Sequence, residues 1–156
     1  MFLELAFVLG LVHNLLLICV FNSNRVKNNK LIKTFGFAYL VLVIPLAIIC
    51  LILSIFENKP LFYYLYLVIV LVYLGFEVVL DWVLKINFRS KSKLYLLIPY
   101  LMLYFFANYV LVILVWKENL TLGVILLALY IIQLLFNAFS HESVRRFFKS
   151  FIAQKS

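Results

Sequence analysis

The stretch GFEVVLDWVLKINFRSKSK, Gly75 to Lys93, decides the fold of this chain. It is the end of a long apolar run that carries Glu77 and Asp81, and it leads directly into a basic loop. No other apolar run of the sequence contains two acids. Charged side chains are costly in lipid, and loops rich in lysine and arginine mark the cytoplasmic side of a membrane. The stretch therefore predicts a membrane-spanning helix that ends at a cytoplasmic loop and contributes to a polar interior.

Composition places the whole chain in the membrane class. Of the 156 residues, 67% are hydrophobic and 13% are charged, whereas a soluble domain is about half apolar and about a quarter charged. No soluble fold of this length could bury so much apolar surface, so we expect lipid to be the solvent for much of it. One membrane domain, residues 1–156, is expected.

Five apolar runs have the length of membrane-spanning helices. Each is roughly 17–25 residues long, which matches a hydrocarbon core of about 30 Å. Each must be helical, because lipid offers no partners to backbone polar groups. A helix in a soluble bundle would show a polar face, which Phe62–Phe76 lacks. The predicted fold is an all-α polytopic bundle; the alternative is four spans with one re-entrant or interfacial segment. The predicted helices are residues 3–21, 34–56, 60–84, 94–116 and 120–139.

Lysine and arginine set the expected orientation. Twelve of the 14 basic residues fall after the first run, after the third run and in the C-terminal tail, and only Lys59 and Lys117 fall elsewhere. This predicts an N-terminus outside and a C-terminus in the cytoplasm, in the cell membrane. The net charge of +8 is spread over three short segments, so we expect the lipid bilayer as partner and no nucleic acid.

The C-terminal tail predicts an amphipathic helix over about residues 141–153. Its apolar side chains fall on one face and basic side chains flank that face, which is typical of a helix that lies on the inner membrane surface. The alternative is a frayed basic tail. The predicted contacts with lipid headgroups are Arg145, Arg146 and Lys149.

Polar residues inside the predicted helices are the candidates for function, because such residues usually face protein or water. Three of them, His13, Glu77 and Gln133, each precede an arginine by twelve positions. Twelve helical residues rise about 18 Å, so we expect these three at a common depth. The full candidate cluster is His13, Asn14, Glu77, Asp81, Asn108, Gln133 and Asn137.

Two pairs in this cluster have the same spacing. Glu77 and Asp81 lie four positions apart, as do Gln133 and Asn137, and side chains at this spacing share a helix face. The match is compatible with an internal repeat of helix hairpins, as many transporters have, and also with chance. The common depth does not depend on a repeat.

The cluster fits two kinds of function. In the first, it is a polar clamp in which Glu77 is neutral or pairs with His13. This predicts a small accessory subunit that packs against itself or a larger membrane partner, and it is the leading expectation. In the second, the cluster is a proton or cation path, as in a small transporter or channel. Glu77 carries the proton or cation, Asp81 lies at the inner mouth of the path, and His13 relays protons. A transporter needs a wet path to Glu77, whereas a clamp is sealed by helices.

Motifs of known enzymes are missing from the sequence. His141-Glu142 lacks the second histidine of an HExxH zinc site, and the chain has no GxSxG turn and no glycine-rich phosphate loop. Cys19 and Cys50 form neither a CxxC motif nor a disulfide framework. We therefore expect no enzymatic activity, no cofactor and no bound metal.

One segment resembles other proteins. Residues 81–116, DWVLKINFRSKSKLYLLIPYLMLYFFANYVLVILVW, are similar to a stretch of small multi-pass prokaryotic membrane proteins of uncharacterised function. The segment is less than a quarter of the chain. The resemblance implies a protein of a prokaryotic inner membrane and no particular activity.

Overall fold

The computed structural model describes residues 1–85 and 94–140, and within them it is helical with no strand. Five helices are long and apolar enough to cross a membrane, so the all-α bundle of five spans is confirmed. The predicted tail helix at 141–153, with Arg145, Arg146 and Lys149, lies outside the described residues. The elements are α1 (Phe2–Arg25), α2 (Asn29–Phe56), α3 (Leu61–Glu77) with its π-helical continuation η1 (Val78–Val83), α4 (Leu94–Trp116) and α5 (Leu120–Ser140).

The first two helices are longer than the apolar runs that predict them. The runs end at residue 21 and begin again at 34, but α1 continues to Arg25 and α2 begins at Asn29. Lys27 turns the chain with a φ of 55°, and Asn28 caps α2 by accepting a hydrogen bond from the Leu31 N–H at 3.2 Å. Most of the expected basic loop is therefore helix, and its charged side chains project from the helix ends.

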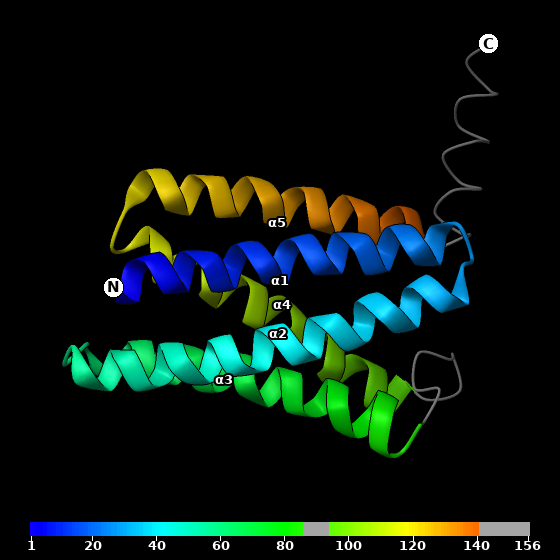
Figure 1. Cartoon of the computed structure of the whole chain (residues 1–156), viewed down its shortest axis with the longest axis horizontal. Coiled ribbons are helices and arrows are strands. Elements are labelled where there is room, and N and C mark those ends of the chain that lie inside the picture. The colour runs from blue at the N-terminus through cyan, green and yellow to red at the C-terminus, as the bar shows by residue number, and fades with distance from the viewer. Residues whose placement is uncertain (86–93, 141–156) are drawn as a thin grey trace, which may run out of the picture.

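The helices are packed together at one end of the bundle and splayed at the other (Figure 1). Helix α1 packs most extensively on α2 and α5, and α3 packs most extensively on α4. The two groups also meet through α2–α3 and α4–α5 contacts. In Figure 1, η1 diverges from the beginning of α2, while the other ends of α2 and α3 remain side by side.

The packed end, here called the closed end, carries a network of polar contacts over an apolar core. Lys59 Nζ donates a hydrogen bond to Glu118 Oε1 at 2.9 Å and so ties the α2–α3 turn to the α4–α5 turn. That hydrogen bond lowers the pKa of the Glu118 carboxyl below its ordinary value. Glu57 accepts a hydrogen bond from the Phe2 N–H at 2.9 Å. The buried side chains beneath include Leu9, Tyr63, Leu67, Leu111, Leu114 and Leu126.

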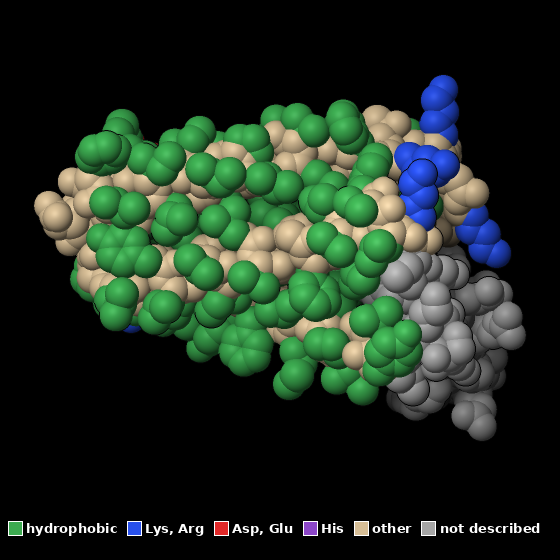
Figure 2. Space-filling model, turned by 90° about the horizontal axis from the view of Figure 1, so that it is seen from below, with side chains coloured by type: hydrophobic (Ala, Val, Ile, Leu, Met, Phe, Trp, Pro, Cys, Tyr) green, Lys and Arg blue, Asp and Glu red, His purple; other side chains and the backbone are tan. Residues whose placement is uncertain are grey.

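Apolar side chains cover the length of the bundle on the face shown in Figure 2, and Lys and Arg side chains gather at one end. Large exposed apolar residues occur on all five helices, as suits a surface that contacts lipid. The charged end, here called the basic end, is the splayed end, because α1 finishes there, α2 begins there and η1 finishes there. Its described basic residues are Arg25, Lys27, Lys30, Lys33 and Lys85.

Gly123 is expected to be essential for the close approach of α4 and α5. A Cβ atom at this position would lie 2.6 Å from Trp116 Cα, so Gly123→Ala must push the two helices apart. Overpacking of this kind typically costs about 1–3 kcal/mol, which denaturant unfolding of the purified protein would measure. The matched control is Gly75→Ala, where the Cβ meets no atom within 4 Å and stability should be unchanged or higher by up to about 1 kcal/mol. Wild-type stability of Gly123→Ala would contradict this account of the α4–α5 hairpin.

Candidate functional site

A cavity of about 750 Å³ lies between the helices at the basic end. All five helices line it, and three lining residues, Asn24, Lys85 and Ser140, lie at or near the ends of their helical segments. The cavity therefore extends from the bundle interior to its basic end. The residues that line it include Lys33, Gly36, Tyr39, Glu77, Asp81, Trp82, Lys85, Tyr100, Tyr104 and Asn137.

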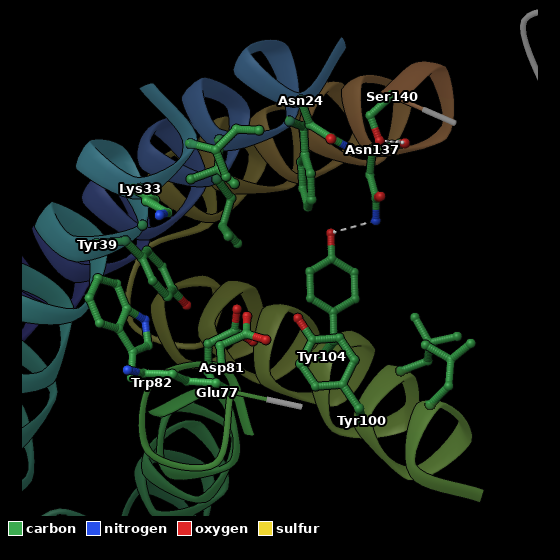
Figure 3. Close-up of a pocket in the computed structure, with 18 residues that line it drawn as sticks. Asn24, Lys33, Tyr39, Glu77, Asp81, Trp82, Tyr100, Tyr104, Asn137 and Ser140 are labelled. Atoms are coloured by element: carbon green, nitrogen blue, oxygen red, sulfur yellow. Dashed lines mark hydrogen bonds between the residues drawn. The ribbon is translucent and has the colours of Figure 1, made fainter. Parts of the chain in front are cut away.

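The two acids of the third span both line this cavity, as their four-residue spacing predicts. Glu77 is the last residue of α3, and Asp81 lies within η1. The π-helix is recognised by a hydrogen bond that spans five residues: the Leu84 N–H donates to the Val79 carbonyl at 2.8 Å. Single π-turns inside longer helices occur frequently at functional sites. Figure 3 shows both carboxylates pointing into the space between α2 and α4.

Four aromatic side chains surround the acids, and sequence analysis did not identify them as a group. Tyr39 comes from α2, Trp82 from η1, and Tyr100 and Tyr104 from α4 (Figure 3). The three tyrosines are almost completely buried. The Tyr104 hydroxyl accepts a hydrogen bond from Asn137 Nδ2 at 3.3 Å. The inner part of the cavity therefore combines carboxylates with aromatic rings.

His13 lies beside the cavity, fully buried, in a hydrogen-bond chain that begins at the cavity wall. Its Nε2 is 3.1 Å from Asn108 Oδ1, and its Nδ1 is 3.1 Å from the Tyr39 hydroxyl. The Asn108 amide nitrogen donates to the Tyr104 carbonyl at 2.8 Å, so Asn108 Oδ1 can only accept. His13 Nε2 therefore carries a hydrogen, and when the imidazole is neutral its Nδ1 accepts a hydrogen bond from the Tyr39 hydroxyl.

The predicted pairing of His13 with Glu77 is wrong. Both nitrogens of the His13 ring are engaged, by Asn108 and Tyr39, and neither is left for a carboxylate. Glu77 instead lines the cavity, which His13 does not. A common depth in the membrane does not determine the direction in which a side chain points around its helix.

The seven residues of the predicted cluster form two groups. Glu77, Asp81 and Asn137 line the cavity. The other four are buried and do not line it: His13 and Asn108 bond to each other, and Asn14 Nδ2 donates to the Gly10 carbonyl of its own helix at 2.8 Å. Gln133 is fully buried, and its amide makes no hydrogen bond within the described ranges. The predicted pair Gln133/Asn137 is therefore divided between the two groups.

Metal-binding geometry is missing from the part of the chain that the structure describes, where no three His, Cys, Asp or Glu side chains come together. Cys19 and Cys50 are both free thiols. Comparisons of the chain with models of protein families, with curated proteins and with solved structures found no match. Function is therefore inferred from the cavity and the residues that line it.

Proposed function

We propose that this protein is a small transporter of the cell membrane that takes a solute into the cavity from the cytoplasm. Glu77 holds a proton or cation that is exchanged for the solute. One observation carries the proposal: Glu77 and Asp81 line a cavity of about 750 Å³ that extends to the basic end of the bundle. Acids within membrane spans typically mark the pathways of ions or substrates. A polar clamp would instead seal these carboxylates between helices.

The charge distribution supports a cytoplasmic location for the basic end. The described basic end carries five Lys or Arg residues, whereas the closed end carries Lys59 and Lys117 beside Glu4, Glu57 and Glu118. By the positive-inside rule, the N-terminus is outside and the C-terminus is in the cytoplasm. The proposed membrane is a prokaryotic inner membrane, with the bilayer as principal partner. The proposed role is not enzymatic and needs no cofactor or nucleic acid.

Transport also requires a second state in which the closed end opens. In the described conformation, the hydrogen bonds Lys59–Glu118 and Phe2–Glu57 hold that end together. We propose that they break when the bundle opens toward the outside and Glu77 becomes accessible from there. The Lys59 and Glu118 side chains are 19% and 24% exposed, and ion pairs at a protein surface contribute about 0.2–1 kcal/mol. Water can therefore replace this contact when the closed end opens, and the contact can re-form within a transport cycle.

A second candidate function is the accessory subunit that the sequence first suggests. The observation in its favour is a shallow aromatic pocket of about 270 Å³ on α4 and α5. Its lining residues Phe105, Phe106 and Tyr109 are each about half exposed, and such a surface can receive a helix of a second copy or of a larger membrane protein. It shares no lining residue with the cavity.

A cysteine in place of Gly36 tests the transporter proposal. Gly36 lines the cavity, and a Cβ there would meet no atom within 4 Å. In a chain without Cys19 and Cys50, Gly36→Cys should react with a charged, membrane-impermeant maleimide in inverted vesicles and not in intact cells. The reason is that the reactive thiolate forms in contact with water.

The native Cys50 provides the matched control. It lies on the same helix and is fully buried near the closed end, so with Cys19→Ser alone it should remain unlabelled from both sides. Labelling of Gly36→Cys in intact cells, or its failure to react in inverted vesicles, would contradict a cavity open to the cytoplasm.

A further inference from the structure

We infer that the solute is an organic ammonium ion, bound by Glu77 and Asp81 together with the rings of Tyr39, Trp82, Tyr100 and Tyr104. These six residues are here called the acid–aromatic site. The inference rests on the proposed function and adds the chemical class of the substrate.

The aromatic rings are the first argument for this class. A cation over the face of Trp or Tyr is attracted by the quadrupole of the ring, and cages of such rings are a recurrent means of binding quaternary ammonium groups. In Figure 3, Trp82 and Tyr39 lie on one side of the two carboxylates, and Tyr104 and Tyr100 lie on the other. The site thus offers ring surfaces and negative charge to one positively charged group.

The size of the cavity is the second argument. A volume of about 750 Å³ lies in the range of sites for drug-sized ligands. Inorganic cations such as Ca²⁺ instead need six or more oxygen ligands at close distances, and the described residues bring no three candidate metal ligands together. An organic cation with apolar substituents would fill the space, with its substituents against the apolar lining of Leu17, Phe21, Leu97 and Leu101.

The arrangement of charge along the cavity is the third argument. Lys33 and Lys85 line the part of the cavity nearest the basic end and are exposed. Glu77 and Asp81 are half-buried. Lys85 follows the end of η1, so it lies nearer the basic end than Glu77 and Asp81. Lysine side chains at such a position extend their ammonium groups toward water and lipid phosphates. The inner part of the cavity is therefore negative and aromatic, and an anion would be held only at the mouth.

The fluorescence of Trp82 can report binding directly, because Trp82 lines the cavity. The only other tryptophan of the sequence is Trp116, at the closed end. In Trp116→Phe protein, held in nanodiscs of phosphatidylglycerol, fluorescence reports Trp82 alone. The probes are choline and its uncharged carbon isostere, 3,3-dimethylbutan-1-ol. We expect choline to change Trp82 fluorescence with an affinity at least tenfold higher than that of the isostere.

Matched variants separate the acid–aromatic site from nonspecific effects. Glu77→Gln and Asp81→Asn should each weaken choline binding by at least tenfold, whereas Glu4→Gln, at the exposed closed end, should not. Tyr104→Leu should weaken binding and Tyr104→Phe, which keeps the ring, should restore it. Tyr109→Leu, on the same helix but 55% exposed, should bind as the wild type does. Circular dichroism confirms that each variant is folded.

The possible outcomes distinguish this inference from the function on which it rests. Equal affinity for choline and its isostere would overturn the ammonium inference and leave a cavity that binds solutes. No response of Trp82 to either probe, or a stronger response to inorganic phosphate, would also overturn it, while labelling of Gly36→Cys decides the proposed function independently. Adding phosphatidylethanolamine to the nanodiscs identifies the source: competition with choline indicates a lipid headgroup, and no competition indicates a free ammonium compound.

Discussion

Replacing His13 by leucine is expected to cost about 1–3 kcal/mol of unfolding free energy. The change removes the hydrogen bonds of a fully buried ring to Tyr39 and Asn108, and a buried polar group left without its partner costs about 1–3 kcal/mol. Hydrogen bonds between membrane helices are worth less, about 0.6 kcal/mol on average, because the unfolded helices find other partners in the bilayer. His13 joins α1 to both α2 and α4 through these two hydrogen bonds. We therefore expect the stability of the bundle to be especially sensitive to substitution at this position.

Unfolding of the purified protein by sodium dodecyl sulfate in mixed micelles would measure the effect. Tyr109→Phe, at a position of α4 that is 55% exposed, is the control and should change stability by no more than a few tenths of a kcal/mol. Tyr39→Phe combined with His13→Leu should recover part of the loss, with a coupling of about 1 kcal/mol. The same cycle with Glu77→Leu in place of Tyr39→Phe should show a smaller coupling. Strict additivity of His13→Leu and Tyr39→Phe would contradict the hydrogen-bond chain.

The sequence was sufficient to predict the five spans, because hydropathy is a local property and lipid allows such runs only one backbone conformation. The basic residues also predicted that the turn between α1 and α2 and the end of η1 lie at the same end of the bundle. Helix ends were less predictable. Arg25 and Lys30 are helical, since polar residues continue a helix once it has left the hydrocarbon layer.

The cavity was not predictable in this way, because it depends on how the helices diverge and rotate. Spacing correctly placed Glu77 and Asp81 on one side, but nothing in the sequence near Val78 signals the π-helix that begins there. The direction of His13 is set by packing against α2 and α4, and this explains the error in its predicted partner.

One signal of the site was present in the sequence. Tyr100, Tyr104 and Asn108 follow one another at intervals of four and therefore mark one face of α4. That face carries the tyrosines of the cavity and the partner of His13. Tyrosine is common near membrane interfaces, so a single tyrosine is weak evidence for a functional site. The repeated spacing of two tyrosines and an asparagine within an apolar run is stronger evidence for a polar interior.

The proposed exchange requires that Glu77 in the cavity holds the proton that leaves when the solute binds. Glu77→Gln preserves the shape of the side chain and removes the proton that it can release. In proteoliposomes containing a pH-sensitive dye, an inward or outward gradient of a choline-like ammonium compound should change the internal pH, because the Glu77 proton leaves when the cation binds and returns when it departs.

Solute-driven proton flux in these vesicles, compared between wild type and Glu77→Gln, is the most direct test. We expect Glu77→Gln to insert with unchanged melting temperature and to lose at least nine-tenths of the flux. Glu4→Gln, which removes an acid at the exposed closed end, should retain the wild-type flux. Equal flux in wild type and Glu77→Gln, or no solute-driven pH change in the wild type, would contradict the account.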